Sequence, residues 1–125
     1  MKHRIMLLGV LLLCSAITMT ADDKKKAEKE VTIKGEVVDV ACYVAHGAKG
    51  EGHKACGESC AKAGGALGIL TADGKLYVSL LPDDHKSGPN DALMEHVSHT
   101  VEAKGFVRSK AGVSGLMITS VAMAK

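Results

Sequence analysis

The chain has 125 residues, with 16 basic and 14 acidic side chains and a formal net charge of +2 at neutral pH. Its aromatic residues are Tyr43, Tyr77 and Phe106, too few for the stacking surfaces on which single-stranded nucleic acids bind. Neither the charge nor the aromatic content predicts a nucleic-acid partner.

The first 21 residues have the order of a secretory signal peptide. A basic start that includes Lys2 and Arg4 precedes an apolar run over residues 5–13, and small and polar residues follow to Ala21. The apolar run is too short to span a bilayer, so we expect no stable membrane insertion after cleavage. Cys14 is placed like a lipid-modified cysteine, but Leu13 stands where such signals have a small residue. Export to the periplasm or the extracellular space is therefore predicted.

Two segments follow the predicted signal, a charged leader and a single domain. Residues 22–30 (DDKKKAEKE) are almost wholly polar and predict a flexible leader. Beyond residue 21 the acidic and basic residues are equal in number, so the predicted mature chain has no net charge. Residues 31–125 are long enough for one domain with a modest core, which a cross-link or a metal ion would help to stabilise.

The first half of the domain reads as strands around a long insertion. Alternating β-branched residues from position 31 to 40 predict a strand, and Gly35 within it predicts a bulge or a sharp bend. Short apolar runs at 66–71 and 75–81 predict two more strands. The Asp73-Gly74 pair between them predicts a hairpin turn in which both residues have positive φ.

The second half predicts a helix and two strands. Asn90 is placed to cap a short helix whose Leu93, Met94 and Val97 face inward. Strands are expected at residues 100–107 and 116–123, joined by a loop over 108–115. This order predicts a mainly β domain, a five-stranded OB-type barrel. One helix would lie between strands three and four, and a helical Cys/His-rich insertion (residues 42–65) between strands one and two. A small open β-sandwich is the alternative.

Three runs carry a resemblance to known proteins: VTIKGEVVDVACY, LTADGKLYVSLL and VEAKGFV…GLMITSV. With Asp39, Cys42 and Tyr43 closing the first run, they resemble small exported bacterial OB-fold proteins. Those proteins have an Asp-x-x-Cys-Tyr end to the first strand and a Gly/His/Cys-rich insertion. The likeness covers most of residues 31–123. It implies the fold and not a particular activity.

Within the insertion, residues 53–63 predict a helix that the Gly64-Gly65 pair ends. Such a helix places His53, Cys56 and Cys60 on one face. Side chains four apart on a helix have Cβ atoms about 5–6 Å apart, whereas a disulfide needs roughly 3.5–4.5 Å. Cys56 and Cys60 are therefore predicted to share a third partner and not to bond to each other.

Cys42, at the end of the first strand, is the expected third partner. Glycines at 47, 50 and 52 let the chain double back, so one cluster could contain the five candidate metal ligands Cys42, His46, His53, Cys56 and Cys60. Thiolate and imidazole ligands together suit a soft ion, zinc or copper. Asp39 beside the cluster is either an outer acceptor for a ligating histidine or a half-exposed strand residue.

Two other interpretations of the cysteines remain open. In an oxidising compartment Cys42 could form a disulfide with Cys56 or Cys60. This disulfide staple would hold the insertion on the barrel and make the protein a structural envelope domain. Alternatively, Cys56 near a helix N-terminus could act as a redox thiol that another cysteine resolves. The sequence has no hydrolytic serine motif and no phosphate-binding loop, so a non-enzymatic module that binds a metal ion or a small ligand is predicted. In an OB-type barrel the insertion and the loop over 108–112 would share one rim.

Overall fold

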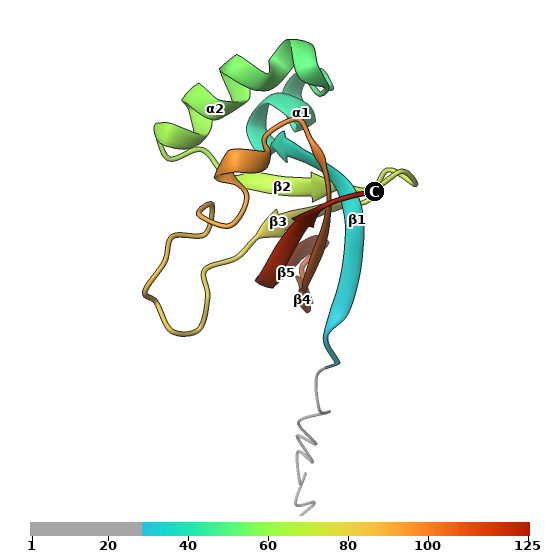
Figure 1. The fold of residues 1–125 in the computed structure, drawn as a ribbon, viewed down its shortest axis with the longest axis vertical. Helices are drawn as coiled ribbons and strands as arrows, with labels where there is room; N and C mark the ends of the chain where they lie inside the picture. The colour runs from blue at the N-terminus through green and yellow to red at the C-terminus, as the bar shows by residue number, and fades with distance from the viewer. Residues whose placement is uncertain (1–28) are drawn as a thin grey trace, which may run out of the picture.

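The computed structural model describes residues 29–125 (Figure 1). The predicted signal peptide, most of the leader and Cys14 lie outside the described residues. The described chain forms these elements in order: β1 (Val31–Asp39), α1 (Val40–His46), the 3-10 helix η1 (Glu51–His53), α2 (Lys54–Lys62), β2 (Leu67–Leu70), β3 (Leu76–Ser79), the 3-10 helix η2 (Met94–His96), β4 (Thr100–Lys110) and β5 (Val113–Met123).

The five strands form a closed barrel in the order β1-β2-β3-β5-β4, with β1 pairing β4 to complete it. All neighbouring strands are antiparallel except β3 and β5, which run parallel. The predicted mainly β barrel is confirmed. Both α-helices lie between β1 and β2, and they cover one end of the barrel, away from the start of β1 (Figure 1). None of the helices in residues 29–125 is long and apolar enough to cross a membrane.

Gly35 lies at the position where β1 changes its partner strand. Residues before it pair with β4, whereas Glu36 pairs with both β4 and β2, and the rest of β1 pairs with β2. A Cβ at Gly35 would overlap with the carbonyl oxygen of Leu70. Glycine is therefore required here because the two backbones cross closely at a corner of the barrel.

Replacing Gly35 with alanine is expected to destabilise the barrel by about 1–3 kcal/mol, because the added methyl group must push a backbone carbonyl aside. Urea unfolding followed by circular dichroism measures this change. Gly52→Ala is the matched control, since an added Cβ there meets no atom within 4 Å, and a change within about 0.5 kcal/mol is expected. Equal stability of the two variants would refute the corner assignment.

The two hairpins differ in detail from the predicted ones. The turn between β2 and β3 is confirmed, but Gly74 has positive φ and Asp73 does not. The Thr71 hydroxyl accepts a hydrogen bond from the Lys75 backbone N–H instead, within a wider turn. Strands β4 and β5 pair as far as Lys110 and Val113, so the predicted loop over 108–115 is wrong; most of it is strand.

The predicted helix after Asn90 is also wrong, because only the 3-10 helix η2 forms there. The side chain of Asn90 does not cap it. Its Oδ1 accepts from the Leu67 N–H at 2.9 Å and its amide donates to the Gly65 carbonyl at 2.7 Å. Asn90 therefore ties this segment to the end of the insertion, while Leu93 and Val97 enter the core as predicted.

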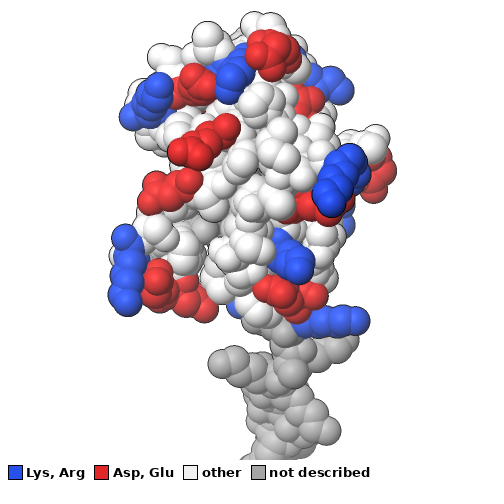
Figure 2. Space-filling model, viewed as in Figure 1, with Lys and Arg blue, Asp and Glu red and all other residues white. Residues whose placement is uncertain are grey.

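The core fills the barrel, and the helices contribute little to it. The core cluster consists of the buried residues Val37, Ala61, Leu67, Ile69, Tyr77, Leu93, Val97, Val101, Ala103 and Leu116. Helix α1 has no buried residue, and α2 buries only Gly57 and Ala61. The insertion thus lies on the barrel without an apolar core of its own. Acidic and basic side chains are interspersed over the face seen in Figure 2.

Candidate metal centre

Cys42 is held in the first turn of α1 by Asp39. The Asp39 side chain caps the helix, because its Oδ1 accepts from the Cys42 backbone N–H at 2.7 Å. At the other end Gly47, with φ of 67°, closes the helix by donating to the Tyr43 carbonyl. An aspartate cap before the first turn and a left-handed glycine after the last are strong helix boundaries. The Cys42 side chain is thereby fixed at the end of the barrel.

The chain then returns through a glycine-rich loop to place the second half of the site. The Gly50 N–H donates to the Glu36 carboxylate, which ties this loop to β1. Helix α2 follows, and it ends as Gly64 takes positive φ and the Gly65 N–H donates to the Cys60 carbonyl at 2.9 Å. The predicted helix and its glycine stop are confirmed.

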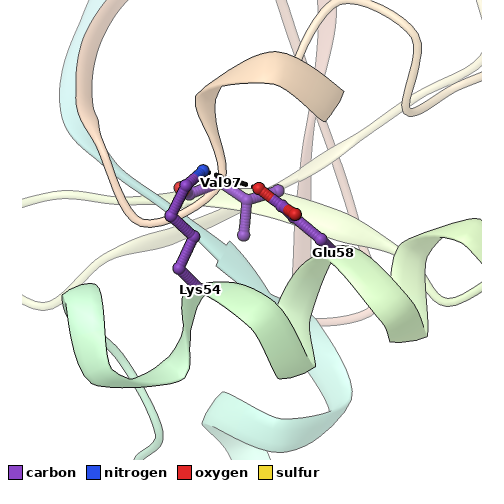
Figure 3. Close-up of polar contacts among 3 residues, drawn as sticks. All are labelled: Lys54, Glu58 and Val97. Atoms are coloured by element: carbon purple, nitrogen blue, oxygen red, sulfur yellow. Dashed lines mark hydrogen bonds and ion pairs between the residues drawn. The ribbon is translucent and has the colours of Figure 1, made fainter.

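Helix α2 packs closely against the segment that carries Val97. A Cβ at Gly57 would lie 2.9 Å from Val97 Cγ1, so glycine permits the close approach. The Lys54 ammonium donates to the Val97 carbonyl at 3.3 Å and to the Glu58 carboxylate at 2.6 Å (Figure 3). These contacts set the position of the helix face that bears the two cysteines.

Two groups of potential ligands result, and Cys42 belongs to both. In the first group the donor atoms of Cys42, His53 and Cys56 lie within 4.8 Å of one another. In the second group those of Asp39, Cys42 and Cys60 do. Four of the five residues predicted as ligands are therefore brought together around one thiol.

His46 is placed differently from these four. It is exposed in the last turn of α1 and belongs to neither group. Asp39 is more central than the sequence indicated. It is 1% exposed, so the half-exposed alternative is wrong. Its role could have been found from the Asp-x-x-Cys spacing, since an N-cap aspartate necessarily lies beside the residue three positions later.

Each group contains one buried polar atom with unmet hydrogen-bonding capacity. Among residues 29–125, His53 Nε2 and Asp39 Oδ2 are fully buried and have no hydrogen-bond partner. Buried polar atoms are almost always paired, so an unpaired one calls for an explanation such as a bound ion. Both atoms belong to residues of the ligand groups, so a metal ion bound there could be the missing partner.

The surroundings raise the pKa of two of the thiols. The Asp39 carboxylate beside the thiol raises the pKa of Cys42 from 9.0 to about 12, and burial adds to the shift. Burial, together with the neighbouring Cys56, raises the pKa of Cys60. Without a metal these thiols are protonated at neutral pH, so a metal ion has to displace their protons and binds more tightly as the pH rises.

The three thiols in residues 29–125 are free. The donor set combines thiol, imidazole and carboxylate groups, and Cys56 is exposed, so the cluster is open to solvent on that side. Soft sulfur donors with one imidazole favour thiophilic ions over magnesium or calcium. In comparisons with known proteins, no family model, curated protein or solved structure matches this chain.

Proposed function

We propose that this protein is an exported, non-enzymatic OB-type domain that binds a soft metal ion, zinc or copper, through its insertion. One observation carries the proposal: the donor atoms of Cys42, His53 and Cys56 lie within 4.8 Å of one another, and the same imidazole has a buried Nε2 without a hydrogen-bond partner. Cys60, which interacts with both Cys42 and Cys56, supplies a further thiol within the cluster.

The donor set favours zinc as the first ion to test. Zinc takes cysteine and histidine ligands in tetrahedral sites, with Zn–S of about 2.3 Å and Zn–N of about 2.0–2.1 Å. Copper(I) accepts the same thiolates. An imidazole with two thiols from two helices, as in the group of Cys42, His53 and Cys56, is a ligand combination that zinc sites use.

A metal ion would also stabilise the insertion, which has few buried side chains to hold it together. Helix α1 contributes no buried residue, and α2 contributes only Gly57 and Ala61. Small domains often replace a missing apolar core by a metal cross-link. An ion bound to Cys42 on one side and to His53 and Cys56 on the other would join the two helices directly.

The proposal also includes the OB type of the barrel and the export of the protein. A closed five-stranded barrel in which β3 runs parallel to β5 supports the OB type. Export rests on the sequence of residues 1–21, whose order is that of a signal peptide.

Thiol chemistry supplies the competing functions. Cys42 lies close enough to both other cysteines that an oxidised protein could join it to either of them. Redox-active cysteines, however, have a lowered pKa, whereas the pKa values of Cys42 and Cys60 are raised. The raised pKa values therefore argue against a redox role for these two thiols.

A single preparation tests the proposed function. The protein is isolated from an oxidising compartment without chelators, its metal content is measured, and its free thiols are counted before and after denaturation with a chelator. We expect at least one zinc or copper ion per chain and three thiols that react only after the metal is removed. One reactive thiol with no metal would establish the disulfide staple in its place.

A further inference from the structure

The two ligand groups differ in how far their side chains are exposed to solvent. The outer group, Cys42, His53 and Cys56, includes an exposed thiol, whereas the inner group, Asp39, Cys42 and Cys60, includes a fully buried carboxylate. Only Cys42 is common to both. Ligands of one tetrahedral zinc ion, at bonds of about 2.0–2.3 Å, lie roughly 3.3–3.8 Å apart. The donor atoms of each group lie within 4.8 Å of one another, so each group could form one metal position after its donor atoms move together by about 1 Å.

A single ion in the outer group would leave the inner group unsatisfied. It would use the imidazole of His53 but leave Asp39 Oδ2 buried and without a partner. An unpaired buried carboxylate oxygen is costly. Gly65 keeps the space beside this oxygen open, because a Cβ there would lie 3.1 Å from Asp39 Oδ2.

The inner group also has no positive partner of its own. Asp39 is a buried carboxylate in that group, and the neighbouring Lys54 is already engaged by Glu58 and by the Val97 carbonyl. A cation at the inner position would supply the partner that a buried carboxylate needs.

On the basis of the proposed function, we infer that the centre holds two divalent ions bridged by the Cys42 thiolate. The outer ion is bound by His53 and Cys56, and the inner ion by Asp39 and Cys60. Cys42 completes both positions. Three protein ligands per ion leave each a coordination position for water or for a small ligand.

Native mass spectrometry of the reduced, metal-free protein titrated anaerobically with zinc tests this arrangement. We expect two zinc ions per chain for the unaltered protein, and one for Asp39→Asn. Asparagine keeps the Oδ1 cap of α1 but removes the anionic ligand. Cys60→Ser, which leaves the cap untouched, should also retain one ion. His46→Ala and the exposed Asp83→Asn are the matched controls and should retain two. Circular dichroism of each variant verifies that it is folded.

The outcomes separate the two proposals. One zinc ion in the unaltered protein overturns the second position and leaves the proposed function standing. A protein that binds neither zinc nor, in a parallel titration, copper(I) overturns the proposed function itself. Two ions in both Asp39→Asn and Cys60→Ser would refute the assignment of the inner ligands.

Discussion

Replacing Cys42 with serine is expected to lower the affinity of the protein for zinc by roughly 100-fold or more and to remove both bound ions. Structural zinc sites bind with about 10–16 kcal/mol in total, so one thiolate among three or four ligands carries about 3 kcal/mol. Cys42 is the one residue that both ligand groups share. Competition with a zinc-binding dye of known affinity measures the loss.

His46→Ala is the matched control for this prediction, because His46 lies on the same helix, α1, but is exposed and outside both groups. It should bind zinc as tightly as the unaltered protein. Cys56→Ser should fall between the two, since Cys56 belongs to the outer group alone. If His46→Ala were as damaging as Cys42→Ser, the loop before η1 would have to fold back over the cluster, contrary to the structure.

The barrel was predictable because its signals are local. The β-branched residues of β1, the glycine at its corner and the Asp-Gly turn each fix one feature whatever the rest of the chain does. The prediction of a helix after Asn90 was wrong because of a contact between distant parts of the chain. Asparagine is a residue type that often caps helices, but the side chain of Asn90 forms hydrogen bonds with Gly65 and Leu67, which are far away in sequence. The residue type alone could not show whether the Asn90 side chain would bond to a helix N-terminus or to another part of the chain.

The sequence predicted which residue types form the candidate site, but it predicted less well which individual residues belong to it. Helical spacing places His53, Cys56 and Cys60 on one face, and the structure brings their cluster to Cys42. His46 follows Cys42 by four residues on α1, but it is exposed in the last turn and belongs to neither group. The burial of Asp39 depends on α2 and Gly65 packing over the end of β1, a tertiary contact without a sequence signal.

The last expectation concerns how the insertion is held on the barrel. In the metal-free protein, amides of α1 and α2 should exchange with solvent faster than those of the barrel strands, because the insertion buries few apolar side chains. Free zinc at about 1,000 times its dissociation constant should slow that exchange by up to about 1,000-fold, since it binds only the closed form. Hydrogen–deuterium exchange with mass spectrometry, with and without zinc, resolves the two regions.

Cys42→Ser provides the control for this effect. Without the thiol common to both ligand groups, the same zinc concentration should slow exchange in residues 40–65 by about tenfold or less, and His46→Ala should respond like the unaltered protein. Slow exchange of α2 in the metal-free protein would mean that Ala61, Gly57 and the Lys54 contacts to Val97 suffice to hold the helix. The centre would then bind metal without stabilising the fold. Fast exchange that zinc suppresses would show that the cysteines and the histidine substitute for the apolar core that the insertion lacks.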